Sequence, residues 1–530
     1  MVDILFTDAR IVDGTGAPWF RGAVTVEGDR IEGVYRGRQT RPDADRTIEL
    51  DGAVLCPGFV DTHSHSDLEL FRDPALEPKV RQGVTTEILG QDGFSLAPVA
   101  DENRTEWERQ VRALAGDVDR EWDWNTIEGY YDALESTGIG PNAATLVGHG
   151  TVRHEVMGMA DREPTEAELE EMVDLVDAAL DRGAIGFSTG LIYTPQTYAD
   201  TAEVEQLAGV LAPYGRPFVA HIRSERSRIW AAMDEFVDIG ARQGIPIHLS
   251  HFKMGPPQHG RAERGIALLE TARDRGVDMT AEVYPYTAGS TQLSYVLPPW
   301  VHAEGAEKAL EYVAEAESRR RIRRDIEDHC IDGWENPGKA SGWENVVVTR
   351  AEATPEFEGE SVADLADEQD TDPVTAVCDV LRANEMDATC VNHFLEESDV
   401  REILACDRVC IGSDGIFGGR PHPRVYGTYP RVLGHYAREE KLLGLEDAVR
   451  KATSLPARAM GLHRKGVVRA GLDADLVVFD PRTVGTDATY ETPHRYPEGI
   501  DHVLVNGEFV VRHGETTEAR PGRAIRAGFD

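Results

Sequence analysis

The sequence predicts an α/β protein with a parallel (β/α)8 barrel and a small β-sandwich built from both ends of the chain. Two observations predict this fold. Both ends alternate apolar and polar residues over short runs, whereas the middle alternates apolar runs with charged helical stretches. Alternation with period two indicates half-buried strands, and the strand–helix alternation indicates βα units around a parallel sheet.

The β-sandwich is predicted from strand patterns with glycine turns at both ends. Examples are "DILFTDARIVDGTG" and "GAVTVEGDRIEGVY" near the start, and "GVVRAGLDADLVVFD" and "DHVLVNGEFVVRHG" near the end. Because both ends are rich in strand patterns, we expect them to pair. Residues 1–57 and 461–530 should then form the β-sandwich, and residues 58–460 the barrel.

Eight apolar runs are candidates for the barrel strands, the number that a TIM-like barrel requires. They are "AVLCPGFVDTH", "GVTTEILG", "AATLVGHG", "AIGFST", "PFVAHIR", "PIHLSH", "DMTAEVYPY" and "RVCIGSDG". A ninth run, "DATCVNHF", competes for a place. The stretch of roughly residues 292–350 exceeds an ordinary βα loop of about 2–6 residues, so we expect an insertion before the last barrel strand.

Composition excludes several classes of partner. The 530 residues include 55 basic and 94 acidic ones, for a formal net charge of −39, which repels nucleic acids and anionic membranes. We found no run of roughly 18 apolar residues, as a membrane span requires, and no basic signal-peptide region. The six cysteines contain no CxxC pair, so we expect reduced thiols and a cytoplasmic protein. Excess acid with scarce lysine resembles halophilic proteins, whose self-repulsion is screened by salt.

Histidine and aspartate residues gather at the C-terminal ends of the predicted strands, where a barrel carries its active site. In "FVDTHSHSD" the two histidines are two positions apart, so they share one face of the strand. A single histidine at a strand end is more often a satisfied polar residue than a ligand, and Asp92 or Asp414 alone is also explained as a turn residue or a helix N-cap. Together they would converge on the barrel axis, and imidazole and carboxylate are ligands that zinc accepts. The candidate ligands are His63, His65, Asp92, His221, His251 and Asp414.

Longer blocks around these residues resemble the amidohydrolase superfamily, and more narrowly the N-acyl-D-amino-acid deacylase (D-aminoacylase) family. The blocks are "VRQGVTTEILGQDGFSLAP", "TLVGHGTVR", "GFSTGLIYTP", "AHIRSE", "SHFKMG", "VYPYTAGST" and "HPRVYGTYPRVLG". The resemblance covers nearly the whole chain. It implies a metal-dependent hydrolase barrel with one or two Zn²⁺ ions, which removes the acyl group from a small N-acyl-D-amino acid.

One ligand position departs from the family pattern. Members of the best-described type carry a bridging cysteine thiolate where this chain has Asp92, which is a harder ligand, so the number of metal ions stays open. Glu87 lies earlier on the same strand and is a weaker candidate. Related cyclic amidases use a carboxylated lysine from strand four, but no lysine occurs between Lys79 and Lys253.

The resemblance also implies roles in the reaction. Zinc lowers the pKa of a bound water toward about 7, and Asp414 would take its proton and later deliver it to the leaving amine. Either His149 or His63 would stabilise the oxyanion.

For His248, three residues before His251, we expect the opposite face of its strand, toward the helices. The positions that match substrate contacts are Tyr193, Lys253, Tyr284, Ser290 and Arg424, of which the arginine suits an α-carboxylate.

Three alternatives remain at this stage. The chain could be a cyclic amidase of the dihydroorotase or hydantoinase kind, or a deacylase of acidic substrates such as N-acyl-D-glutamate and N-acyl-D-aspartate. A further cation beside Arg424 would favour the acidic substrates, and an apolar pocket would favour apolar ones. An inactive barrel serving as a scaffold is the third alternative, although every ligand position here holds a competent ligand. The oligomeric state is not indicated.

Overall fold

The computed structural model describes residues 2–37, 39–328, 331 and 334–528. Eight parallel strands form the barrel, as predicted. One sheet has the order β17-β13-β12-β11-β10-β9, another has the order β6-β7-β8, and β8 continues into β9 beyond Leu146. A parallel bridge between Ser64 and Gly415 closes the ring. The strands are β6 (Phe59–Asp61), β7 (Val84–Leu89), β8 (Asn142–Thr145), β9 (Val147–Gly148), β10 (Phe187–Gly190), β11 (Phe218–His221), β12 (Ile247–Leu249), β13 (Met279–Val283) and β17 (Val409–Ile411).

Alternation along these strands divides the residues between two cores. On β11, Phe218 and Ala220 belong to the large core between the strands and the helices, whereas Val219 belongs to the core inside the barrel. His221 is two residues after Val219, so it also faces the interior. Met460 and Ile525 belong to the same interior core. Apolar packing therefore fills the barrel below the strand ends and leaves polar side chains at the other mouth.

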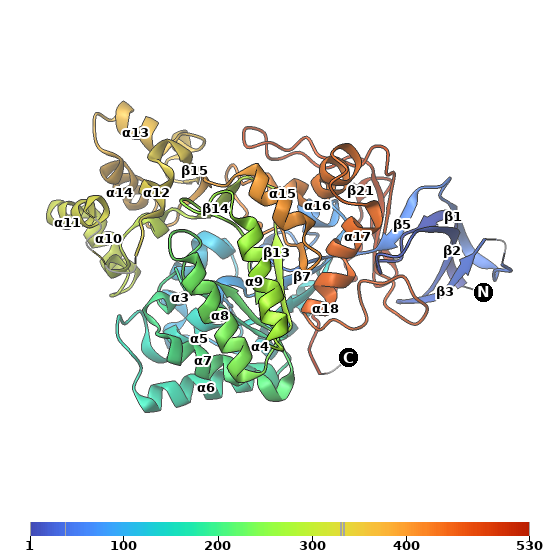
Figure 1. The fold of residues 1–530 in the computed structure, drawn as a ribbon, viewed down its shortest axis with the longest axis horizontal. Helices are drawn as coiled ribbons and strands as arrows, with labels where there is room; N and C mark the ends of the chain where they lie inside the picture. The colour runs from blue at the N-terminus through green and yellow to red at the C-terminus, as the bar shows by residue number, and fades with distance from the viewer. Residues whose placement is uncertain (1, 38, 329–330, 332–333, 529–530) are drawn as a thin grey trace.

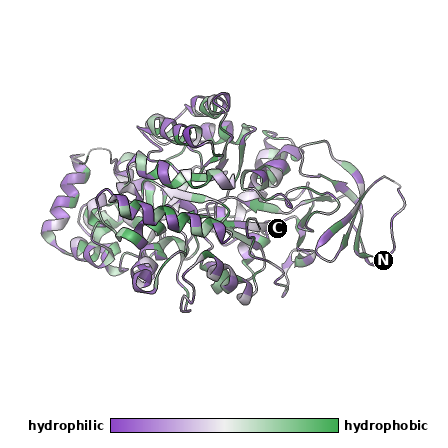
Figure 2. Ribbon diagram, turned by 90° about the horizontal axis from the view of Figure 1, so that it is seen from below, coloured by the Kyte–Doolittle hydropathy of each residue, from purple (hydrophilic) through white to green (hydrophobic). Residues whose placement is uncertain are grey.

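Helices surround the barrel (Figure 1). A capping box between Thr165 and Glu168 starts α6, and the Asp200 side chain caps α7. Hydrophobic and hydrophilic residues alternate along the helices in Figure 2, as expected where one face packs on the strands. These helices are α1 (Glu69–Arg72), α2 (Glu77–Val80), α3 (Asp101–Ala115), α4 (Ile127–Thr137), α5 (His149–Met157), α6 (Glu166–Asp181), α7 (Thr201–Gly209), α8 (Ile229–Gln243), α9 (Ala262–Asp274), α15 (Glu397–Ala405), α16 (Arg424–Arg431), α17 (Leu445–Ala452) and α18 (Ser454–Ala459).

Both ends of the chain build one nine-stranded sheet, at the right of Figure 1. Antiparallel pairing of β5 with β18 joins the two ends. The rings of Phe6 on β1 and Phe509 on β20 lie 6.3 Å apart, although β5, β18 and β19 separate these strands in the sheet. The sheet therefore folds over a shared core, which is the predicted β-sandwich. Its strands are β1 (Val2–Ile11), β2 (Phe20–Glu27), β3 (Arg30–Arg36), β4 (Ala44–Glu49), β5 (Val54–Pro57), β18 (Leu476–Phe479), β19 (Ile500–Val505), β20 (Glu508–Arg512) and β21 (Glu515–Thr516).

A separate subdomain follows β13 and has its own hydrophobic core, at the upper left of Figure 1. The competing run "DATCVNHF" forms β16 here, in the antiparallel order β14-β16-β15, and not in the barrel. None of the helices that the structure describes is long and apolar enough to cross a membrane. The elements of the subdomain are β14 (Ala288–Gln292), α10 (Ala306–Ala314), α11 (Ala316–Glu327), α12 (Pro337–Ser341), β15 (Val346–Arg350), α13 (Val362–Glu368), α14 (Pro373–Ala383) and β16 (Thr389–His393).

Candidate metal centre

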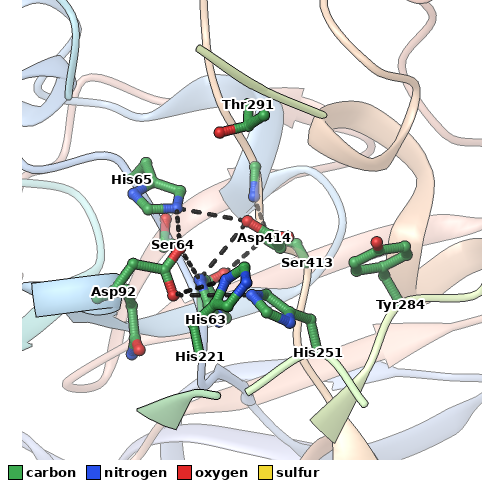
Figure 3. A network of polar contacts seen from close by, with 12 residues as sticks. His63, Ser64, His65, Asp92, His221, His251, Tyr284, Thr291, Ser413 and Asp414 are labelled. Carbon is green, nitrogen blue, oxygen red and sulfur yellow. Dashed lines mark hydrogen bonds and ion pairs between the residues drawn. The ribbon is translucent and has the colours of Figure 1, made fainter. Parts of the chain in front are cut away.

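The six predicted ligand side chains converge at the C-terminal mouth of the barrel (Figure 3). Nε2 of His63 lies 3.6 Å from Oδ2 of Asp92 and 3.5 Å from Oδ1 of Asp414. Nε2 of His65 lies 3.7 Å and 3.4 Å from the same two oxygens. Two imidazoles and two carboxylates thus surround one point without bonding to one another, which is the spacing expected of ligands around a shared cation.

The second oxygen of Asp92 faces the other two histidines. Its Oδ1 lies 3.8 Å from Nδ1 of His221 and 3.7 Å from Nε2 of His251. Asp92 therefore stands between two pairs of imidazoles and presents one oxygen to each pair. A carboxylate in this position is able to bridge two cations.

Three of these residues have a backbone conformation that is uncommon outside glycine. The φ angles are +54° for Asp92, +32° for His251 and +52° for Asp414. Such conformations cost about 1–3 kcal/mol each and persist where the surroundings hold them. The backbone N–H of Asp414 donates a 2.8 Å hydrogen bond to the backbone carbonyl of His63. Each sharp bend directly after a strand turns the side chain toward the barrel axis.

Several polar atoms at this point are buried and lack a hydrogen-bond partner. They are Nε2 of His63, both ring nitrogens of His221 and Oδ1 of Asp92. Leaving such a group unpaired costs about 1–3 kcal/mol, so buried polar atoms without a partner are rare in native proteins. A cation would use these lone pairs. The histidine and carboxylate donors fit zinc by their chemistry.

Carboxylates further out hold the rings in place. Nδ1 of His63 donates to Oε1 of Glu282 at 2.6 Å, and Oε1 of Glu225 lies 3.0 Å from Nδ1 of His251. A carboxylate on one ring nitrogen directs the other nitrogen toward the centre and increases its basicity. These contacts prepare Nε2 of both rings for a ligand role.

A family model described as the amidohydrolase family matches residues 46–511. The chain belongs to the amidohydrolase family. A D-aminoacylase of Alcaligenes xylosoxydans xylosoxydans is 35% identical, with 99% of this chain and 97% of that protein covered. An N-acyl-D-glutamate deacylase of the same organism is 34% identical, with 99% and 96% covered. An N-acyl-D-glutamate deacylase of Bordetella bronchiseptica, solved with zinc and a phosphonate inhibitor, matches with a TM-score of 0.84 at 34% identity and covers 99% of this chain and 100% of its own. The resemblance predicted from the sequence blocks is confirmed.

His248 faces the inside of the barrel in this amidohydrolase, which corrects the prediction. We expected this side chain to face the helices, but Nε2 bonds Oε2 of Glu282 at 2.8 Å inside the barrel. The expectation was wrong because β12 ends at Leu249, and the turn at His251 breaks the alternation of faces. His248 and His63 therefore hold the two oxygens of one carboxylate.

A buried lysine lies beneath the metal centre of this amidohydrolase. Nζ of Lys79 lies 2.6 Å from Oδ2 of Asp61, 2.7 Å from Oγ of Ser413 and 3.4 Å from Oε2 of Glu87. Burial opposes its charge, but the carboxylates of Asp61 and Glu87 raise the pKa of Lys79 above its ordinary value. Glu87, the weaker candidate ligand, is engaged by Lys79 and by Ser66, so it does not join the six converging side chains.

Four of the five predicted substrate-contacting residues are linked around the centre. Nζ of Lys253 lies 3.4 Å from the hydroxyl of Tyr284, and the guanidinium of Arg424 lies 4.7 Å from the centre of the Tyr284 ring. Arg424 also reaches Oδ2 of Asp414 at 2.9 Å and donates to the carbonyl of Ser290 at 3.0 Å. The fifth, Tyr193, lines the pocket over the centre, together with Lys253 and Ser290.

His149, one of the two predicted oxyanion groups, is engaged elsewhere. Its Nδ1 lies 2.9 Å from Oγ1 of Thr189, and its Nε2 lies 2.8 Å from Oε1 of Glu203. Burial lowers the pKa of His149, despite the Glu203 carboxylate. Because both ring nitrogens have partners, this geometry gives His149 no free nitrogen for an oxyanion.

The prediction missed Glu282, Glu225 and the pair of Lys79 and Asp61. Glu282 had a detectable signal, since it is a charged residue within the apolar run "DMTAEVYPY". Glu225 follows His221 by four residues in "AHIRSE", but spacing alone does not indicate which histidine it contacts. Lys79 lies on α2 and its partner Asp61 on β6, so nothing in the local sequence indicates this pair.

Proposed function

We propose that this amidohydrolase removes the acyl group from N-acyl-D-amino acids, giving a carboxylate and the free D-amino acid. One observation carries the proposal: Asp92 lies between two imidazole pairs with Asp414 beside it. The proposal is supported by 35% and 34% identity, over 99% of the chain, to a D-aminoacylase and an N-acyl-D-glutamate deacylase.

The proposed ligands divide into two sets. His63, His65 and Asp414 would hold one zinc ion, and His221 and His251 a second, with Asp92 shared. When bound, zinc would polarise the scissile carbonyl and lower the pKa of a water molecule to about 7. Glu282 and Glu225 would fix the imidazole orientations for this purpose.

Asp414 is the proposed base and acid. Burial alone would raise its pKa, but the Arg424 guanidinium and the His63 ring hold the pKa of Asp414 well below its ordinary value. The carboxylate is therefore ionised at neutral pH and able to accept a proton from the attacking water. It would then deliver that proton to the nitrogen of the leaving amine.

The cations beside this carboxylate would hold the substrate. Lys253 and Arg424 both contact Tyr284, so two positive charges and a hydroxyl group gather on one side of the centre. An α-carboxylate placed there would accept charge-assisted hydrogen bonds. Ser290 and Tyr193 would complete the wall. Anchoring this end fixes the amide carbonyl over the centre, and the chirality of the α-carbon then decides which substituent enters the pocket.

A substrate panel tests the proposal. Zinc-loaded protein is incubated with N-acetyl-D- and N-acetyl-L-amino acids, and the free amino acid is quantified by chromatography. We expect hydrolysis of D-substrates at rates well above those of their L-enantiomers. Hydantoins and dihydroorotate in the same panel test the cyclic amidase alternative. Equal turnover of both enantiomers contradicts the proposal, as does a lack of turnover by protein with full metal content. Protein that binds no zinc supports the alternative of an inactive scaffold.

We also propose that the protein works in the cytoplasm at high salt. The five described cysteines are free, as a reducing compartment would keep them. The net charge of −39 gives a surface whose self-repulsion salt would screen.

A further inference from the structure

Arg226 lies in the loop between β11 and α8 and lines the pocket over the metal centre. It also lines the neighbouring outer pocket, between the barrel and the subdomain that follows β13. The residue is only 9% exposed. A guanidinium at the junction of these two pockets lies where a substrate group that points away from the metal centre would pass.

The charge of Arg226 has no carboxylate partner among the residues that the structure describes. Its guanidinium lies 4.6 Å from the centre of the Phe394 ring, and its Nε is buried without a hydrogen bond. The adjacent Glu225 is already 3.2 Å from Nζ of Lys253 and 3.0 Å from Nδ1 of His251. Nearby Arg223, by contrast, is paired with Glu235 at 3.0 Å.

The other cations at the centre differ from Arg226 in this respect. Lys253 is paired with Glu225, and Arg424 with Asp414. A buried charge without a partner is costly, and arginine forms a planar fork that matches a carboxylate. Arg226 has no carboxylate partner among the described residues, so its guanidinium is suited to an anion that arrives with the substrate.

A hydroxyl group accompanies this guanidinium. Tyr295 lines both pockets with Arg226, and its hydroxyl oxygen accepts a 2.7 Å hydrogen bond from Nδ2 of Asn392. The hydrogen of the Tyr295 hydroxyl is therefore available for donation. Arg226 and Tyr295 therefore offer hydrogen-bond donors to the same two pockets, whereas Lys253 and Arg424 both contact Tyr284.

We propose that Arg226, with Tyr295, binds a second carboxylate of the substrate, in addition to the α-carboxylate. This inference rests on the proposed deacylase function and narrows its substrate class to N-acyl-D-amino acids with two carboxylates. The second carboxylate comes either from an acidic side chain, as in D-glutamate, or from a dicarboxylic acyl group, as in an N-succinyl amino acid. Both sources present the same group to the same donors.

The test compares charged substrates with matched neutral ones. N-acetyl-D-glutamate is paired with N-acetyl-D-glutamine, and N-succinyl-D-leucine with N-butyryl-D-leucine, on zinc-loaded full-length protein. We expect kcat/KM to be at least tenfold higher for the charged member of one pair. A preference in the first pair assigns the carboxylate to the side chain, and a preference in the second assigns it to the acyl group; either supports the proposal.

Two variants test whether Arg226 and Tyr295 cause the preference for charged substrates. In Arg226→Met we expect the charged-to-neutral ratio of kcat/KM to fall by about 10–100-fold, mainly through KM, because the second carboxylate loses a charge-assisted hydrogen bond. Tyr295→Phe should lower the same ratio by a smaller factor. Arg223→Met, which removes a paired guanidinium, is the matched control and should keep the wild-type ratio.

The outcomes separate this inference from the proposed function. The inference is overturned, while the deacylase function stands, if wild-type protein prefers the neutral member of both pairs. It is also overturned if Arg226→Met lowers kcat/KM for all substrates by the same factor. If zinc-loaded protein hydrolyses none of the substrates, the deacylase function itself is overturned. Zinc content and circular dichroism of each variant establish that the compared proteins are folded and loaded.

Discussion

Glu282 and His63 are joined by a 2.6 Å hydrogen bond inside the barrel, and the other oxygen of Glu282 contacts His248 at 2.8 Å. We predict that Glu282→Gln lowers zinc affinity by roughly 10–100-fold, because an amide offers one acceptor where two histidines need one each. Competition with a chromophoric chelator measures the affinity. Glu311→Gln, in an exposed pair with Lys308, is the control and should bind zinc as wild type does. Unchanged affinity in Glu282→Gln would exclude this role.

Asp92 offers one oxygen to each imidazole pair, so its loss should affect the two pairs unequally. We predict that Asp92→Ala loses zinc from the His221 and His251 position, because two protein ligands remain there, fewer than the three or four that zinc sites use. His63, His65 and Asp414 would still supply three. Elemental analysis should show fewer ions per chain than wild type, and Asp92→Cys should restore them. Equal stoichiometry in Asp92→Ala contradicts the bridging role.

Asp414 is proposed to move the proton between water and the leaving amine. We predict that Asp414→Asn lowers kcat by about 10²–10⁴-fold, the usual contribution of a positioned acid and base. The initial rate on an N-acetyl-D-amino acid measures it, with zinc content determined in parallel. Asp407→Asn is a control, because the Asp407 side chain is 92% exposed. Activity of Asp414→Asn within twofold of wild type, with zinc bound, would falsify the assignment.

Lys79 holds two buried carboxylates beneath the metal centre. We predict that Lys79→Met lowers the free energy of unfolding by about 3–5 kcal/mol, because Asp61 and Glu87 lose their buried counter-charge. Urea denaturation measures the change. Adding Asp61→Asn to the variant should recover part of the loss, since it removes one buried charge. Lys308→Met, at an exposed pair, should change stability by no more than about 0.5 kcal/mol. A loss that small in Lys79→Met contradicts the prediction.

The excess of acidic residues should make stability depend on salt. We predict that the melting temperature rises by several degrees between about 0.1 M and 1 M salt, because the Debye length falls from about 10 Å to about 3 Å. Differential scanning fluorimetry measures it. The same rise in NaCl and KCl would separate screening from the binding of one particular cation. A flat or falling melting temperature rules out the halophilic proposal.

The sequence predicted the barrel, the β-sandwich and the six converging side chains from local patterns. Strand alternation, glycine turns and polar residues after apolar runs are each encoded within a few neighbouring residues. His63 and His65 could be placed side by side because they are two positions apart, although β6 ends at Asp61 and both lie just beyond it. The competing strand "DATCVNHF" could not be assigned this way, because its local pattern suits either sheet and only its pairing with β14 and β15 decides.

By itself, then, the sequence determined which residues reach the mouth of the barrel and which chemistry they offer. Only the tertiary structure decided how Asp92 divides its oxygens, where His248 points and which charges find partners. These properties depend on contacts between residues far apart in the chain, such as Lys79 with Ser413 or His63 with Glu282. The guanidinium of Arg226 is of the same kind, since its lack of a carboxylate partner among the described residues is visible only in the folded chain.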